Sequence, residues 1–92
     1  MPEIERAARE KIREKISNGA LPLAAPHRTW GGPGEGLECV VCERPISKDQ
    51  VEFEVHFIQE GQAAPEVKRF HLDCFAAWEL ERSLLLRKSA TS

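Results

Sequence analysis

The chain has 92 residues and a formal net charge of −2. This length allows one small domain, and a small core is marginal unless a metal ion or disulfide bonds support it. The near-neutral charge gives no sign of a nucleic-acid or membrane partner. There is no apolar run long enough to span a bilayer, and the charged N-terminus lacks the apolar core of a signal peptide. We therefore expect a cytoplasmic protein.

An amphipathic helix is expected over residues 3–17, within an N-terminal segment 1–19. Its apolar side chains recur every four residues: Ile4, Ala8, Ile12 and Ile16. Gly19 is placed to end the helix in the left-handed conformation. A stripe this narrow cannot stabilise a helix alone in water, so the helix must dock on the rest of the chain, on a copy of itself or on a partner. The candidate partner contacts are Ile4, Ile12 and Ile16.

Residues 20–36 contain three prolines and four glycines. This composition predicts a linker without regular structure. Trp30 is unusual in such a segment. Two interpretations stay open: either the indole folds back onto the small core, or it is an exposed anchor for a partner, since interface hot spots are rich in tryptophan.

A compact domain is expected over residues 37–88, in which a β-hairpin follows the turn that carries the first two cysteines. Residues 51–58 alternate between apolar and polar side chains, which predicts a half-buried strand. Val51, Phe53, Val55 and Phe57 form its apolar face, and Glu52, Glu54 and His56 form a solvated face. Residues 67–71 can return as the paired strand, after an irregular turn around residues 61–65.

A second helix is expected from Asp73 to about Lys88, followed by a flexible tail over residues 89–92. Its broad apolar face includes Phe75 and Trp78, which we expect to cover the hairpin. The leucine run at 84–86 exceeds what one helix face buries on so small a domain. It either packs against the first helix or forms a seam between copies.

The three cysteines and one histidine form two pairs with the same spacing. Cys39 and Cys42 are separated by two residues, 28 residues follow, and then His71 and Cys74 repeat the two-residue gap. Three cysteines cannot all pair within one chain, and in a reducing compartment paired spacings favour metal over disulfides. Three thiolates and one imidazole match a tetrahedral structural zinc site. We predict one Zn²⁺ bound by these four residues.

Other chemistry fits these residues less well. Cys42 is followed by a turn rather than a helix, unlike a thioredoxin-type motif, and an iron site of the rubredoxin kind is expected to use four cysteines. The simplest alternative is that three buried cysteines and a core histidine share this spacing by chance. A catalytic zinc keeps one position open, whereas four protein ligands fill the shell here. We therefore expect no enzyme activity and no small-molecule substrate.

The order of cysteine turn, hairpin and ligands at a helix start resembles the treble-clef class of zinc fingers. Within that class the spacing is similar to the poly(ADP-ribose) polymerase-type finger, including "CERPI" after the first pair and "HLDCF" around the second. Half of a LIM domain is also similar. The resemblance covers about residues 37–80. It implies a small α+β fold, the ligands Cys39, Cys42, His71 and Cys74, and binding to DNA breaks.

The charge of this segment disagrees with the DNA-binding implication. Residues 37–88 contain ten acidic and seven basic residues, whereas affinity for nucleic acid comes mainly from Lys and Arg on phosphates. Only Lys48, Lys68 and Arg69 could form a local basic patch. The first hypothesis is therefore a non-catalytic zinc domain that acts as a protein-interaction or regulatory module through a partner or self-association. The alternative is DNA binding, and a redox role of the thiols is a remoter one.

Overall fold

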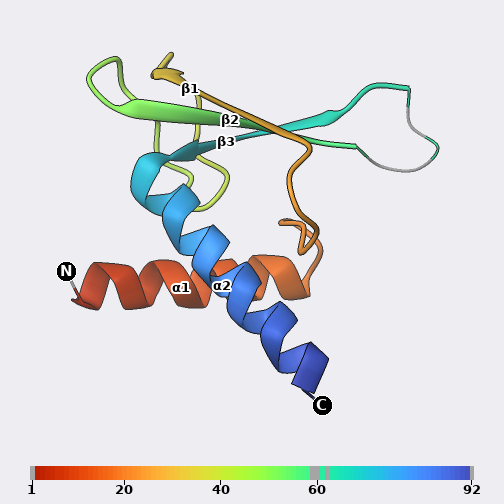
Figure 1. Ribbon diagram of the computed structural model, residues 1–92. Coiled ribbons are helices and arrows are strands. Elements are labelled where there is room, and N and C mark those ends of the chain that lie inside the picture. The colour runs from red at the N-terminus through yellow and green to blue at the C-terminus, as the bar shows by residue number, and fades with distance from the viewer. Residues whose placement is uncertain (1, 59–60, 62, 92) are drawn as a thin grey trace.

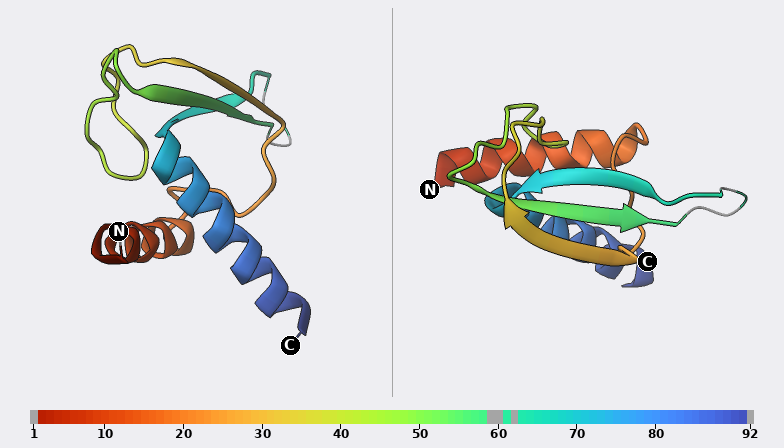
Figure 2. Two further views of the ribbon diagram at one scale, coloured as in Figure 1. Left: turned by 60° about the vertical axis from the view of Figure 1, so that its left-hand side comes forward. Right: turned by 90° about the horizontal axis from the view of Figure 1, so that it is seen from above.

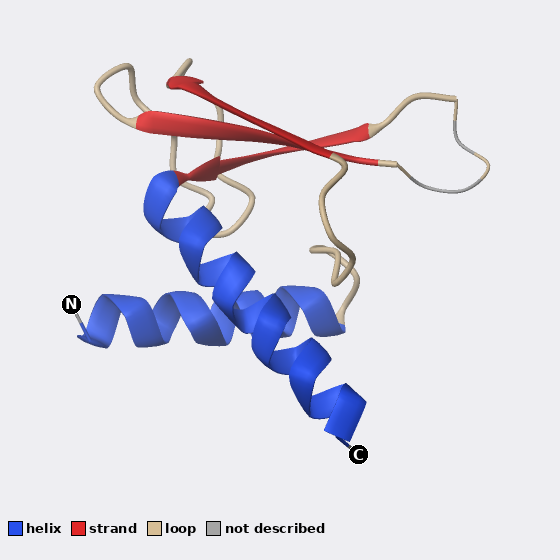
Figure 3. Ribbon diagram, in the orientation of Figure 1, coloured by secondary structure: helices blue, strands red, loops and turns tan. Residues whose placement is uncertain are grey.

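Two helices lie on one side of a three-stranded antiparallel sheet (Figures 1 and 3). The computed structural model describes the backbone of residues 2–58, 61 and 63–91, and the side chains of residues 6–58, 61 and 63–88. The elements in chain order are α1 (Pro2–Ser17), β1 (Arg28–Pro33), β2 (Val51–Phe57), β3 (Glu66–His71) and α2 (Leu72–Thr91). The predicted α+β class, the hairpin and both helices are confirmed, and β1 is an additional strand.

Helix α1 docks on its own chain. Ile12 is fully buried in the core, and Ile16 packs against it. The side chain of Ile4 lies outside the described residues. Gly19 ends the helix as predicted, with a φ of 85°, and the Leu21 N–H donates to the Lys15 carbonyl at 3.0 Å. Ile12 therefore fills the core instead of offering a surface to a partner.

The segment predicted to be a linker contributes the edge strand β1, so the expectation of no regular structure is wrong for residues 28–33. β1 pairs antiparallel with β2, from Arg28 opposite His56 to Pro33 opposite Val51. An edge strand needs hydrogen bonds on one side only, which is why it tolerates glycine and proline. Gly34, directly after it, must be glycine because a Cβ there would collide with the backbone of Ile46 and Ser47.

The central strand β2 pairs with β3 on its other side, with Phe53 opposite Phe70 and Glu54 opposite Arg69. The predicted alternation holds for Phe53, Val55 and Phe57, which face the core. It fails at the start of the strand, where Val51 is exposed and Glu52 is 6% exposed. Gly61, in the turn predicted to be irregular, has a φ of 85°, and residue 62 lies outside the described residues.

Aromatic rings join α2 to the sheet. Phe75 stacks on Phe53 with ring centroids 4.8 Å apart, and Trp78 lies 5.6 Å from Phe57 and 5.4 Å from Phe70. The Trp78 ring is fully buried, and its N–H donates to the Pro22 carbonyl at 3.0 Å. The core role predicted for Trp78 is confirmed, and the same residue fastens the chain that leaves α1.

A buried carboxylate joins the two helices. Glu81 of α2 is fully buried and accepts hydrogen bonds from the guanidinium groups of Arg9 and Arg13 of α1, the latter at 2.7 Å. Burial opposes ionisation of Glu81, but these two hydrogen bonds outweigh it and hold the pKa of Glu81 below its ordinary value. The helix pair thus depends on a buried charge that these two arginines compensate.

Helix α2 runs past the residue where it was expected to end. The helix continues to Thr91, so residues 89–91 are helical rather than a free tail, and residue 92 lies outside the described residues. Leu84 and Leu86 are exposed and Leu85 is half-buried, so α1 covers little of the leucine run. Among the described residues, no helix has the length and apolar character needed to cross a membrane.

Replacing both arginines should destabilise the protein more than replacing the whole ionic group. Arg9→Ala with Arg13→Ala leaves the Glu81 carboxylate buried without a partner, which should lower the free energy of unfolding by about 3–5 kcal/mol. Adding Glu81→Leu should recover a large part of that loss, because the buried charge is then gone. Urea denaturation of the double and triple variants tests this. A triple variant less stable than the double variant would contradict it.

Candidate metal centre

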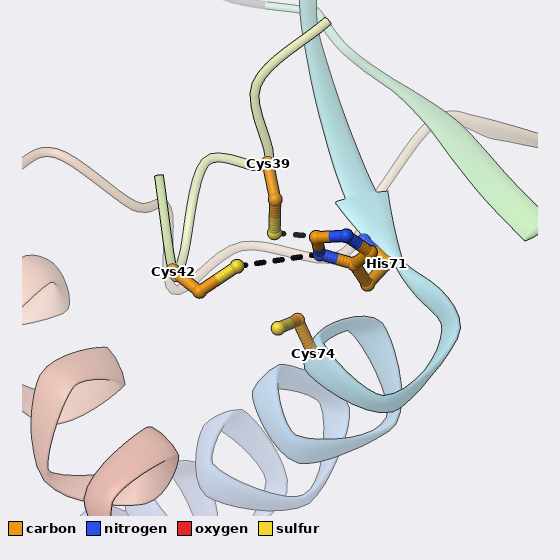
Figure 4. A group of neighbouring side chains, drawn as sticks. All are labelled: Cys39, Cys42, His71 and Cys74. Atoms are coloured by element: carbon orange, nitrogen blue, oxygen red, sulfur yellow. Dashed lines mark hydrogen bonds between the residues drawn. The ribbon is translucent and has the colours of Figure 1, made fainter. Parts of the chain in front are cut away.

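The four ligands predicted from the spacing converge on one point (Figure 4). One ligand atom from each of Cys39, Cys42, His71 and Cys74 lies within 4.8 Å of the others. Cys39 is buried and the other three are half-buried. The first two come from a turn before the hairpin, and the other two come from the junction between β3 and α2. These four residues could hold a metal ion.

The turn that carries the first two cysteines is shaped by its own backbone. The Glu43 N–H donates to the Cys39 carbonyl at 2.9 Å, and the Cys39 N–H donates to the Arg44 carbonyl at 3.0 Å. The Val41 N–H points at the Cys39 sulfur at 3.4 Å. Glu43 takes up the left-handed conformation, with a φ of 64°. The turn thus directs Cys39 inward and supplies it with an N–H donor.

The turn is fastened to the edge of the sheet next to the second pair of ligands. The Val40 N–H donates to the Arg69 carbonyl of β3 at 2.8 Å, two residues before His71. The His71 N–H lies 3.5 Å from the Cys39 sulfur. Because His71 ends β3 and Cys74 lies in the first turn of α2, the change from strand to helix brings both side chains back toward the turn.

The ring of His71 is oriented for binding a metal through Nδ1. Its Nδ1 atom lies 3.3 Å from the Cys42 sulfur, and its Nε2 atom lies 3.2 Å from the Pro45 carbonyl. A carbonyl oxygen can only accept a hydrogen bond, so the proton belongs on Nε2 and the Nδ1 lone pair faces the sulfur atoms. Such an outer hydrogen bond is the usual way in which a protein orients a metal-binding histidine.

The sulfur atoms are too close to be ionised together without a cation. A hydrogen bond with the Cys74 thiol, aided by backbone N–H groups and opposed by burial, lowers the pKa of Cys39 to about 4. The same hydrogen bond, together with burial, raises the pKa of Cys74. The pair therefore shares one negative charge, because neighbouring thiolates repel each other in a buried site. A metal cation removes this repulsion, so the donor set suits one.

Trp30, the other candidate partner contact, lies on the sheet face opposite the helices. Its side chain is 47% exposed, and its ring meets His56 edge-on with centroids 4.5 Å apart. The guanidinium of Arg28 lies 5.9 Å from its centroid. His56 is half-buried and lies 2.9 Å from a Glu54 oxygen, so the expectation of a solvated histidine is wrong. The indole does not fold back onto the core.

The three basic candidates do not form one patch. Lys68 and Arg69 are neighbours on β3, so their side chains point to opposite faces of the sheet. Each forms an ion pair with a glutamate: Lys68 pairs with Glu66 at 2.7 Å, and Arg69 pairs with Glu54 at 3.4 Å. Lys48 is exposed in the turn before β2. The charges of Lys68 and Arg69 are therefore balanced within the protein.

Two contributors to the structure escaped the sequence reasoning. The Pro45 carbonyl orients His71, and Glu81 joins the helices. A backbone carbonyl leaves no mark in a sequence beyond the proline of the turn, and Glu81 looks like any surface glutamate of a helix. Neither residue type nor spacing indicated these roles.

No protein-family model, curated protein sequence or solved structure matches this chain. The metal-binding interpretation therefore depends on the geometry of the four side chains themselves.

Backbone strain at Glu43 can be measured with two variants. Glu43→Ala and Glu43→Gly both remove the ion pair with Lys15, which spans 3.2 Å, so their difference isolates the backbone. The left-handed conformation costs an L-residue about 1–2 kcal/mol but costs glycine little, so Glu43→Gly should be the more stable of the two by about 1 kcal/mol. Thermal denaturation at matched metal content tests this, and equal stabilities would contradict it.

Proposed function

We propose that Cys39, Cys42, His71 and Cys74 bind one structural zinc ion, and that the chain is a non-catalytic module for protein interaction or regulation. The observation that carries the proposal is the meeting of all four ligand atoms within 4.8 Å. Two segments that are 28 residues apart in sequence contribute two ligands each. A metal ion at that point would join the turn, the hairpin and α2.

Zinc is the ion that best suits this donor set. With Zn–S distances of about 2.3 Å and Zn–N distances of about 2.0 Å, a tetrahedral site separates neighbouring ligand atoms by roughly 3.5–3.8 Å. The 3.3 Å between the Cys42 sulfur and Nδ1 of His71 and the 4.8 Å limit for the group bracket this value. Magnesium and calcium prefer oxygen ligands, and most iron–sulfur clusters use four cysteines.

The site supports a structural role rather than a catalytic one. Four protein ligands fill a tetrahedral shell and leave no position for water or substrate. No carboxylate belongs to the ligand group among the described residues. When bound, the ion would supply folding energy to a chain with a small core, because ligand deprotonation and metal binding are coupled to folding. This role also requires a reducing compartment, such as the cytoplasm, in which the thiols stay free.

The arrangement of elements supports a treble-clef type of finger. A turn with two cysteines is followed by the β2–β3 hairpin, and the remaining ligands lie at the end of β3 and the start of α2. This is the order on which the resemblance to poly(ADP-ribose) polymerase-type fingers depends. Helix α1 and strand β1 are additions to that pattern, and both contact it directly.

Trp30 supports the interaction role. It is exposed on the outer face of the sheet, where its ring contacts the His56 ring and lies near the Arg28 guanidinium. A tryptophan that is already ordered loses little side-chain freedom on binding, and Trp and Arg dominate interface hot spots. If a partner binds this face, Trp30→Ala should weaken the complex by about 2 kcal/mol or more.

DNA binding stays a prediction from the family resemblance. The pairing of Lys68 and Arg69 with glutamates gives it no support. A mobility-shift titration with broken duplex DNA at low salt separates the two hypotheses. Binding that falls with salt and is lost on changing Lys68 and Arg69 would favour the alternative.

Removing the metal should unfold the domain. Structural zinc contributes about 10 kcal/mol or more, which is comparable to the whole stability of a small domain. We expect native mass spectrometry to find one zinc per chain. A chelator should unfold residues 37–80, which should remove their proton NMR dispersion and the folded circular dichroism signal of the chain. Cys42→Ser and His71→Ala should have the same effect.

His27→Ala is the matched control, because His27 is an exposed histidine outside the ligand group. This variant should keep its zinc and its fold. Unchanged circular dichroism and NMR dispersion after complete metal removal would refute the structural zinc.

A further inference from the structure

Helix α2 is apolar on two opposite faces. One face packs into the core through Phe75, Ala77 and Trp78. The other carries leucines that are exposed, and no element among the described residues covers it. Figure 1 shows α1 passing behind α2, and the right-hand view of Figure 2 shows the sheet lying above the helices. An exposed apolar face of a helix often marks a contact with a partner.

Five exposed residues form a line on this outer face, which we call the α2 stripe: Asp73, Ala76, Leu80, Leu84 and Arg87. At about 100° per residue they fall within an arc of about 80°. Leu80 is 43% and Leu84 is 37% exposed. Spacings of three and four residues are those that bring side chains to one side of a helix for packing against another helix.

The α2 stripe is complementary to itself when reversed. Ala76 and Leu84 lie four residues before and after Leu80, and Asp73 and Arg87 lie seven residues before and after it. In an antiparallel pair centred on Leu80, the small Ala76 therefore faces the large Leu84 of the other copy, and Asp73 faces Arg87. A parallel pair would instead place aspartate against aspartate and arginine against arginine.

The two charges at the ends of the stripe are available for such a contact. Within the described part of the chain, neither Asp73 nor Arg87 forms an ion pair or a side-chain hydrogen bond. By contrast, Glu79 and Arg82, on the flank of the same helix, pair with each other at 3.2 Å. The side-chain sizes and the charges of the α2 stripe therefore both fit a second copy of the same stripe.

We propose that the α2 stripe binds the α2 stripe of a second copy of this chain, forming a two-fold symmetric antiparallel helix pair. This inference rests on the proposed interaction role and names its partner. A two-fold axis through Leu80 makes the interface isologous, so each contact occurs twice. Trp30 lies on the opposite face of the sheet from the helices and stays free in the dimer.

The association of the two copies should be reversible. Two helices alone bury less than the roughly 1,200 Å² at which standard interfaces begin, so the dimer should form at high protein concentration. Sedimentation of the full zinc-loaded chain over a range of concentrations measures this. Leu80→Glu brings two carboxylates together on the axis and should weaken dimerisation at least about tenfold.

Leu86→Glu is the matched control. Leu86 is 42% exposed on the same helix but lies outside the α2 stripe, so this variant makes the same change of charge and should dimerise like the parent chain. A parent chain that stays monomeric at all concentrations would overturn the proposal. So would a dimer that Leu80→Glu and Leu86→Glu affect equally.

Charge reversal tests the antiparallel register. Asp73→Lys opposes Arg87 of the second copy and Arg87→Asp opposes Asp73, so each variant alone should dimerise less than the parent chain. An equimolar mixture of the two variants should recover the dimer. Both basic residues of the Asp73→Lys chain then meet an aspartate of the Arg87→Asp chain. No recovery would refute the register. Because Asp73 adjoins Cys74, the zinc content of each variant is measured first.

The same samples separate this inference from the proposed function. A monomer with one zinc per chain would refute the proposed helix pair and support the proposed structural zinc. A dimer without zinc, disrupted by Leu80→Glu, would support the helix pair and remove the metal role.

Discussion

Three sulfur atoms and one imidazole share a space only 4.8 Å across, and the rest of the structure is arranged around this constraint. Three thiolates at that distance repel one another, so the three cysteines are not all ionised together unless a cation lies among them. The backbone favours the state in which the ligands share a cation. The N–H groups of Val41 and His71 point at the Cys39 sulfur, and the Pro45 carbonyl turns the Nδ1 atom of His71 inward. These contacts cost little in the fold and favour an ion.

The remainder of the chain adds what a single ion cannot provide. An ion would join the turn to the β3–α2 junction, but it would not hold the distant end of α2 or place α1. Trp78 contacts the sheet and the Pro22 carbonyl, and Glu81 attaches α1 through two arginines. The small core and the ligand site therefore adjoin each other along the first half of α2.

This division leaves two exposed surfaces, and they differ in chemistry. The outer face of the sheet presents a tryptophan that lies beside a guanidinium and an imidazole. The outer face of α2 presents leucines between an aspartate and an arginine. A chain that carries its own copy on one face and a different partner on the other would suit an adaptor, and the metal centre would keep both faces rigid.

The sequence by itself determined the ligand set, both helices and the hairpin, because spacing and periodicity are local properties that survive without tertiary context. It did not determine β1: glycine and proline mark the segment as irregular, and only the open edge of β2 makes residues 28–33 a strand. Tertiary packing likewise decided that Ile12 is buried where α1 meets α2, and that Trp30 is left outside. Arg69 pairs with Glu54 and His56 meets Trp30 across strands, and cross-strand register is a long-range property that no local pattern encodes.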